Sequence, residues 1–361
     1  MRRGEIRQAR QTRLVAQRFP DHRTPTSATA RASCFRVRRF GTAPQGSILG
    51  PLFFLIHLND INNNICHGKL RLFADDTTVF YDAYDVNEIE HKIQSDLDKL
   101  NVWFRVNKLT VNAAKCNYIV IKNPAKIVPD LNIYIQDEHI LRYEKIKYLG
   151  VYIDQHLTFK PHIEYLCKKI SPIVGMLSKV RWSLPKNICV MLYNSLVHSK
   201  LAYCIDSWGS ASDTALSPLE KIQKKAIRFI SHSDYLAHTL PLFQQLRIYT
   251  LRNLYFSKIC LLVFKKLNGL NNSIHCNFSY VNHGYGTRST TNHLLKLPET
   301  SGGIMSNSLL RTLSYVGPHF YNSLPTMVKN ADSVSIFKNS LKRWLVSANI
   351  QVYKLMYTHK K

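Results

Sequence analysis

The stretch Leu72-Phe73-Ala74-Asp75-Asp76-Thr77-Thr78-Val79-Phe80 places two adjacent carboxylates between two apolar runs. Both runs are rich in residues that favour strands, so the pattern predicts a tight β-hairpin with Asp75 and Asp76 at its tip. Neighbouring carboxylates repel each other, and an ordered site usually places a cation beside them. Mg²⁺ suits hard oxygen ligands of this kind. The alternative is that the two Asp residues only form a good turn, so the surrounding sequence has to decide.

Further motifs flank this stretch in a fixed order. They are Ala43-Pro44-Gln45-Gly46-Ser47-Ile48-Leu49-Gly50-Pro51, Asn59-Asp60-Ile61, Asn107-Lys108-Leu109-Thr110-Val111-Asn112 with Lys115-Cys116, and Lys147-Tyr148-Leu149-Gly150-Val151-Tyr152-Ile153-Asp154. In this order and spacing they resemble the later palm motifs of reverse transcriptases, most closely those of non-LTR (LINE-type, jockey-like) retrotransposons. The likeness continues weakly through Trp208-Gly209 and residues 224 to 228. We expect it not to cover residues 1 to 40.

The resemblance implies an α+β fold. Residues 41 to 156 would form a partial reverse-transcriptase palm, an antiparallel sheet with packed helices. Residues 157 to 235 would form a helical thumb, and residues 236 to 361 a mostly helical C-terminal region of unknown role. The implied activity is RNA-directed DNA polymerisation, with an RNA template, a DNA primer and deoxynucleoside triphosphates as partners. No protein partner is indicated.

The resemblance also implies roles for single residues. Asp75 and Asp76 would be catalytic and would bind Mg²⁺ or Mn²⁺. Gln45, Gly46 and Lys115 would bind the incoming nucleotide, and Tyr148-Leu149-Gly150 would be the primer grip, where Gly150 lets the backbone approach closely. The expected nucleic-acid-binding residues are Lys168, Lys169, Lys179, Arg181 and Lys186. The alternative for these cations is the solvated basic face of an ordinary helical bundle.

One part of the family pattern has no counterpart in this sequence. Reverse transcriptases bring a third carboxylate to the metals from an early strand, and nothing upstream of Gly41 resembles that motif. Asp21 is the only upstream Asp and lies in a poor strand sequence. We therefore expect a C-terminal fragment with an incomplete metal site, inactive alone, and with the hairpin beside an open sheet edge. The alternatives are a non-catalytic nucleic-acid-binding remnant and a degenerate transposon open reading frame.

The charge of the chain is strongly positive, with 49 Lys and Arg against 23 Asp and Glu, a formal net charge of +26. Such a surplus favours a polyanionic partner, of which nucleic acid is the most common, because neutralising phosphates releases counterions. The alternative is a basic surface that is only solvated. The charge therefore agrees with the motifs without depending on them.

Residues 1 to 40 differ from the rest of the chain. They hold eleven Arg, no Lys and two acidic residues, whereas residues 41 to 361 hold ten Arg and 28 Lys. With few large apolar residues and one sign of charge, this segment is predicted to be disordered. Three interpretations stay open: a basic nucleic-acid-binding arm, a mitochondrial-type presequence, and an unrelated exon joined to an element fragment.

The eight Cys are scattered and form no Cys-x-x-Cys pair, which argues against a zinc ribbon and a compact disulfide framework. No apolar run approaches the roughly 18 residues of a membrane span. The N-terminus lacks the apolar core of a secretory signal. We therefore expect an intracellular protein, in cytoplasm and nucleus, that does not bind membranes.

Apolar spacing predicts several helices. One from Gly46 to Asn62 should pack under the sheet, and one that begins at Asp85 should bury a stripe of apolar residues. That stripe is Ile89, Ile93, Leu97, Leu100 and Phe104. After Pro161 the pattern is helical, over residues 163 to 180, 185 to 201, 216 to 230, 242 to 267 and 337 to 345.

Overall fold

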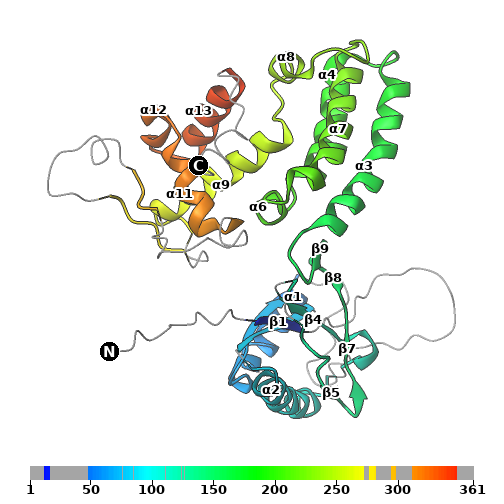
Figure 1. The fold of residues 1–361 in the computed structure, drawn as a ribbon, viewed down its shortest axis with the longest axis vertical. Helices are drawn as coiled ribbons and strands as arrows, with labels where there is room; N and C mark the ends of the chain where they lie inside the picture. The colour runs from blue at the N-terminus through cyan, green and yellow to red at the C-terminus, as the bar shows by residue number, and fades with distance from the viewer. Residues whose placement is uncertain are drawn as a thin grey trace. The chain divides into compact units, whose positions relative to one another are not determined.

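The computed structural model describes residues 12–16, 48–74, 76–83, 85–109, 111–122, 124–125, 127–271, 276–281, 294–297 and 311–347. The chain divides into two compact units, Met1–Thr158 and Phe159–Lys361 (Figure 1). The first unit combines a sheet with helices and the second is mainly helical. The predicted α+β class is therefore confirmed at this level. Within the described ranges, no helix has the length and apolar character to cross a membrane.

The first unit contains a five-stranded sheet with the strand order β2-β3-β1-β4-β7. The strands are β1 Thr12–Ala16, β2 Lys69–Phe73, β3 Asp76–Ala83, β4 Asn117–Ile121 and β7 Leu141–Arg142. All neighbours in this sheet are antiparallel except β4 and β7. Two separate ribbons pair β5 Tyr134–Ile135 with β6 Glu138–His139, and β8 Lys145–Tyr148 with β9 Val151–Asp154.

Strand β1 changes what the sequence predicted for the N-terminal segment. Thr12–Ala16 lies between β3 and β4 and pairs with both, Ala16 being opposite Val79 on one side and Tyr118 on the other. The prediction of disorder is therefore wrong for these residues, and so is that of an open sheet edge beside the hairpin. The Leu14-Val15-Ala16 run is short but apolar, and its backbone satisfies hydrogen-bonding groups of two strands at once. The rest of residues 1 to 40 lies outside the described residues.

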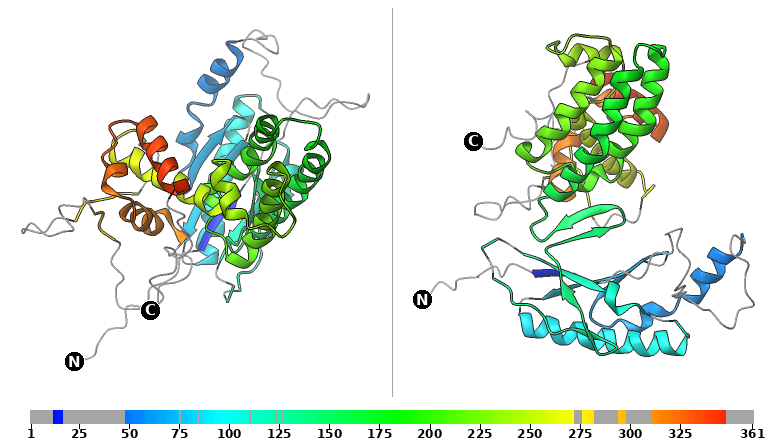
Figure 2. Two further views of the ribbon diagram at one scale, coloured as in Figure 1. Left: turned by 90° about the horizontal axis from the view of Figure 1, so that it is seen from above. Right: turned by 90° about the vertical axis from the view of Figure 1, so that its right-hand side faces the viewer.

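Helix α2, Val86–Val106, packs along the sheet of the first unit (Figure 2). Its N-cap is Asp85, whose carboxylate accepts hydrogen bonds from the backbone N–H groups of Asn87 and Glu88. The predicted stripe is confirmed, because Ile89, Ile93, Leu97, Leu100 and Phe104 are all buried. The spacing of apolar residues was sufficient to predict the buried face, because one continuous face of this long helix packs against one core.

Helix α1, Gly50–His57, differs from the prediction in length and in packing. It is followed by a separate 3-10 turn, η1 Ile61–Asn64, and it stands out from the sheet (Figure 2). None of its residues is buried, and Leu55 and Ile56 are each more than half exposed. Its sequence is apolar on every side, so spacing does not define a single buried face. Phe54 of this helix packs against the core as a half-buried residue, and the buried residues Leu58 and Ile61 follow the helix.

The second unit consists of helices around one core. They are α3 Lys160–Val180, α4 Lys186–Tyr193, a π-helical turn Asn194–His198, α5 Ser199–Ala202, α6 Ile205–Trp208, α7 Asp213–Ile230, α8 Thr239–Gln245, α9 Leu251–Leu267, α11 Leu313–Asn322, α12 Thr326–Lys329 and α13 Val334–Ser347. Helices were predicted over residues 163 to 180, 216 to 230 and 337 to 345, and all three are present. The segment 242 to 267 is broken between α8 and α9, where Arg247 has a φ of 51°.

The sequence placed a domain boundary at residue 235, and the structure differs there. One continuous apolar core runs from Ile163 to Leu345, and α9 contributes Phe256 and Phe264 to it. Phe256 lies 4.7 Å, centroid to centroid, from Phe320 on α11, and Phe264 lies 4.2 Å from Phe337 on α13. Residues 159 to 361 therefore form one unit, because helices on both sides of residue 235 bury the same surface.

The Trp208-Gly209 pair has a packing role in this core. Trp208 is fully buried and donates a hydrogen bond from Nε1 to the backbone oxygen of Tyr203, at 2.9 Å. A Cβ on Gly209 would lie 2.4 Å from the ring of Tyr255 and 2.5 Å from the backbone oxygen of Ile205. Only glycine allows α9 to approach this closely. The weak sequence likeness at this point therefore marks a contact between helices.

His162, on the first turn of α3, makes the second unit sensitive to acid. Burial lowers the pKa of His162 to about 4, in a site beside the rings of Tyr165 and Trp208. In the unfolded chain His162 has its ordinary pKa near 6.5. Between about pH 4 and pH 6.5 the unfolded chain therefore binds a proton that the folded chain does not bind. The neutral His162 therefore costs no stability above about pH 7. The free energy of unfolding falls as the pH drops from about 6.5 toward 4, by up to about 3 kcal/mol.

We expect the free energy of unfolding to fall by about 2 kcal/mol more in the wild type than in a His162→Phe variant between about pH 7.5 and pH 5. Urea unfolding at both pH values measures this difference. His232→Gln, a change of an exposed His in the same unit, provides the matched control. Identical pH dependence in the wild type and His162→Phe would contradict the assignment to His162.

Candidate catalytic hairpin and nucleic-acid interface

Strands β2 and β3 form the predicted hairpin. They pair in an antiparallel register that ends at Phe73 opposite Asp76, so two residues of the sequence connect the paired strands. Ala74 has a φ of 50°, the left-handed conformation typical of the tight turns that join twisted strands. Asp76 is the first residue of β3 and is half-buried. Asp75 lies outside the described residues, so the geometry of the pair rests on Asp76.

The sheet brings Lys115 to the same end as Asp76. Strands β3 and β4 both run antiparallel to β1, so they point in the same direction. Val79 and Tyr118 both lie opposite Ala16, and Asp76 and Lys115 each precede these residues by three positions. Lys115 is exposed at the end of the 3-10 turn η2, Ala113–Lys115. Two candidate residues 39 positions apart in the sequence thus lie at the same end of the strands of this sheet.

The candidate primer grip lies on a different element. Tyr148 ends β8, and Leu149 and Gly150 form the turn into β9, with φ values of 44° and 86°. The base of this ribbon is fixed by the N–H of Lys122, which donates to the oxygen of Gln155 at 3.0 Å. Lys115 precedes β4 and Lys122 follows it. The ribbon is therefore attached at the end of the sheet opposite to Asp76 and Lys115. Gln45 and Gly46 lie outside the described residues.

Asp96 supports the hairpin and was missed by the sequence reasoning. Its side chain is fully buried on α2, among the apolar residues of the stripe. Oδ1 accepts a hydrogen bond from the N–H of Cys66 at 2.9 Å, and Oδ2 accepts from His67 at 3.1 Å and from Gly68 at 2.9 Å. The carboxylate therefore fixes the loop that leads directly into β2. The available signal was an acidic residue one position before Leu97, on the apolar face of the helix.

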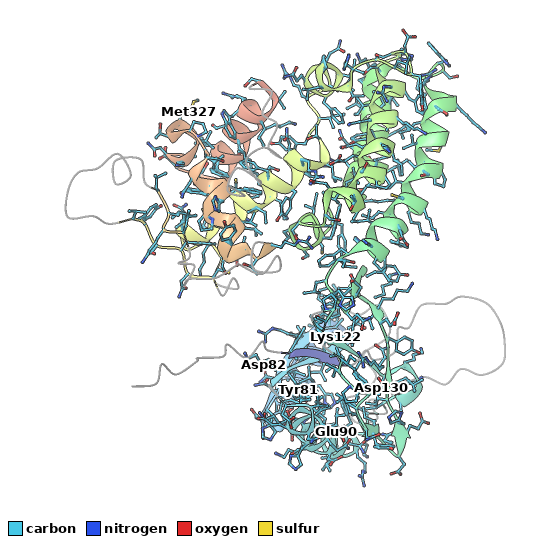
Figure 3. All side chains as sticks on the ribbon, viewed as in Figure 1. Tyr81, Asp82, Glu90, Lys122, Asp130 and Met327 are labelled. Carbon is cyan, nitrogen blue, oxygen red and sulfur yellow. The ribbon has the colours of Figure 1, made fainter. Side chains whose placement is uncertain are left out.

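Gly68 and Tyr81 complete this support. A Cβ on Gly68 would lie 2.3 Å from Cγ1 of Val79 and 2.7 Å from the ring of Tyr81, so the loop passes directly against β3. Tyr81 belongs to the core of the first unit, on the α2 side of the sheet (Figure 3). Burial and the nearby Asp96 carboxylate raise the pKa of Tyr81 far above its ordinary value. The phenol therefore stays neutral beside the buried carboxylate.

The predicted basic residues lie on α3 and on the turn that follows it. Lys168, Lys169 and Lys179 are exposed on α3, Arg181 caps this helix, and the exposed Lys186 begins α4. Lys168 and Lys179 are eleven residues apart, about three helical turns, and so lie on one face. Arg181 lies over the rings of Trp182 and Phe229. Sequence spacing had not indicated these two aromatic contacts.

The described residues do not bring together a full set of metal ligands. In the part of the chain that the structure describes, no three His, Cys, Asp or Glu side chains lie close enough to hold an ion. Strand β1, the neighbour of β3, contains Thr, Arg, Leu, Val and Ala but no carboxylate. The described site therefore supplies Asp76 as a single acidic group at the hairpin.

Comparison with known proteins decides the family. Residues 17–153 match the family described as "Reverse transcriptase (RNA-dependent DNA polymerase)". The chain is 26% identical over 216 residues to the "Probable RNA-directed DNA polymerase from transposon X-element" of Drosophila melanogaster. It is 28% identical over 209 residues to the "RNA-directed DNA polymerase from mobile element jockey" of Drosophila funebris. This chain carries a reverse transcriptase domain of the non-LTR retrotransposon family.

The similarity to relatives is partial on both sides. The alignments cover 57% and 54% of this chain but only 23% of the X-element protein and 22% of the jockey protein. A third relative, from transposon BS of Drosophila melanogaster, is 28% identical over 60% of this chain and 25% of its own length. The chain thus spans about a quarter of the length of each of these three relatives.

The family match also corrects one expectation. It begins at Gln17, upstream of Gly41, where the sequence motifs begin. The prediction that the likeness excludes residues 1 to 40 is therefore wrong for residues 17 to 40.

Proposed function

We propose that this chain is the palm and thumb portion of an RNA-directed DNA polymerase and that it binds an RNA template paired with a DNA primer. The observation that carries the proposal is the hairpin with its two-residue loop, which lies inside the segment that matches the reverse transcriptase family. The sheet of the first unit would be the palm, and the helices from Lys160 onward would be the thumb. Asp76 and Lys115 lie at the same end of the sheet, which supports a nucleotide site at that end.

The proposed roles follow the resemblance. Asp75 and Asp76 would bind Mg²⁺ or Mn²⁺. A bound metal ion would stabilise the charge on the transferred phosphoryl group. Lys115 would contact a nucleotide phosphate as a point charge. Tyr148-Leu149-Gly150 would contact the primer end through its bent backbone, and Gln45 with Gly46 would lie near the template. However, the carboxylates of the described residues do not fit a complete two-metal site.

A second function is favoured by that poor fit. A chain that binds template and primer but does not extend the primer would use the exposed cations of α3 without a metal site. The net charge of +26 supports binding in both cases. Primer extension separates the two functions, whereas duplex binding is common to both.

Binding of an RNA–DNA duplex is expected to weaken steeply with salt. If five cations each neutralise one phosphate, the logarithm of the association constant should fall with log salt at a slope of about −4.5. This corresponds to a loss of about 500-fold between about 50 and 200 mM salt. Sequence preference should be small, because phosphates carry no sequence information. Fluorescence anisotropy with a labelled duplex measures both properties.

A pair of charge variants tests the assignment to α3. The change of Lys168 and Lys179 to Gln should reduce the slope by about two, because two phosphate contacts are lost. The matched control changes Lys338 and Lys342, two exposed lysines on α13, and should leave the slope unchanged. Equal effects of the two double variants would mean that α3 is not the duplex-binding surface.

A further inference from the structure

The C-terminal ends of α3 and α7 meet at one end of the second unit, near α8 (Figure 1). There the guanidinium carbon of Arg181 lies 4.6 Å from the centroid of the Trp182 ring and 5.2 Å from that of Phe229. The ring of His232, in the turn after α7, lies 4.8 Å from that of Trp182. Two helix-end segments thus build one aromatic and cationic surface.

Two aromatic side chains face the solvent here, Trp182 in this surface and Tyr235 three residues after His232. Trp182 and Tyr235 are each 70% exposed, whereas Trp103 and Trp208 are buried. Arg228 lies 6.0 Å from the Tyr235 ring and is held by a hydrogen bond from its Nε to the oxygen of Ala237, at 2.9 Å. Large exposed rings that neighbouring groups hold in place are typical of binding surfaces.

The charge around these rings is mostly positive. The flanking segments 179–186 and 224–238 carry Lys179, Arg181, Lys186, Lys224, Lys225 and Arg228, against one acidic residue, Asp234. Arg181 and Arg228 also lie at helix C-termini, where cations stabilise the helix dipole. The dipole accounts for the two arginines but not for the exposed rings beside them.

We propose that Trp182 and Tyr235 form a stacking platform for the unpaired bases of a single-stranded segment of the RNA template. Every base has a flat apolar face, so stacking on Trp and Tyr requires no particular sequence. The neighbouring cations would bind the phosphates of the same strand. A duplex hides its base faces in its own stack, so this platform selects single strands. The inference rests on the proposed function and gives a ligand to a surface outside the hairpin site.

The test compares two single strands that differ only in their bases. Full-length chain is titrated by anisotropy with labelled oligouridylate and with an abasic strand that has the same number of phosphates. Trp182→Ala should weaken oligouridylate binding about 10-fold and change abasic-strand binding less than about twofold. Trp182→Phe should restore most of the loss. Tyr203→Ala removes an exposed ring outside the patch and should have no effect.

Intrinsic fluorescence gives a second measurement. Because Trp182 is the exposed ring that would stack, oligouridylate should quench the wild type more than Trp182→Phe. An equal loss by Trp182→Ala on both strands, no loss on either, or a loss only on duplex RNA or single-stranded DNA would overturn the platform. If the wild type binds no oligonucleotide at all, the proposed function fails as well. Matching unfolding curves of the wild type and Trp182→Ala exclude misfolding as the cause.

Discussion

Primer extension by this chain on a homopolymer template is expected to stay at least about three powers of ten below that of a polymerase with a complete metal site. Asp75 and Asp76 are adjacent in the sequence, and neighbouring carboxylates repel each other. Strand β1, which pairs with β3, contributes no carboxylate. Asp75 would then have to hold a strongly hydrated cation almost alone, and Mg²⁺ gives up water reluctantly. The attacking oxygen would lack both activation and alignment.

The assay measures incorporation of labelled deoxynucleotide with Mg²⁺ and with Mn²⁺, and the full-length jockey polymerase serves as the positive control. Asp75→Asn sets the background for this chain. Robust incorporation by the wild type that Asp75→Asn abolishes would show that the ligand count is wrong. Asp21→Asn then becomes informative, because the family match begins at residue 17 and Asp21 is the one Asp between residues 17 and 40. Loss of activity in that variant would identify Asp21 as the third carboxylate.

Replacement of Asp96 by Ala is expected to destabilise the first unit by about 4 kcal/mol. The change leaves the part-buried backbone N–H groups of Cys66, His67 and Gly68 without their charged acceptor, and a hydrogen bond to a charged group contributes about 1.5–3 kcal/mol. Asp96→Asn should cost less, about 2 kcal/mol, because one carbonyl oxygen remains as an acceptor. The loop into β2 should loosen first, since Asp96 is its common acceptor.

Hydrogen exchange is the appropriate measurement, because a chain of two units need not unfold in one step. Peptides that cover residues 66 to 80 should exchange about 100-fold faster in Asp96→Ala, while peptides from α9 should be unaffected. The control is Asp98→Ala, which removes an exposed carboxylate two residues along the same helix. If Asp98→Ala accelerates exchange as much as Asp96→Ala, the hydrogen bonds of Asp96 are not the cause.

Some elements could be predicted from the sequence because neighbours in the chain determine them. The hairpin follows from two strand-forming runs and a two-residue turn, and Ala74 closes it within a few residues. The N-terminus of α2 follows from the Asp85 side chain and the next backbone N–H groups. The α2 stripe follows from a period of 3.6 residues against one core. In each case the deciding interaction spans only a few positions.

Other features depend on segments that are far apart in the sequence. Thr12–Ala16 reads as part of an Arg-rich tail, and only β3 and β4, more than 60 residues later, make it a central strand. Lys115 is linked to the hairpin only by the family resemblance until β1 aligns it with Asp76. Trp182 lies in a polar turn, and its neighbour His232 comes from 50 residues further along. Spacing along the chain contains no information on such pairings.

The sequence by itself determined the reverse transcriptase ancestry, the hairpin and the basic character of the chain, because these depend on local motifs and on composition. The tertiary structure decided which residues share the edge of the sheet and that residues 159 to 361 form one unit. It also decided that an acidic side chain of α2 is buried in the core of the first unit. Asp96 is stable there only because three backbone N–H groups from another segment meet its carboxylate.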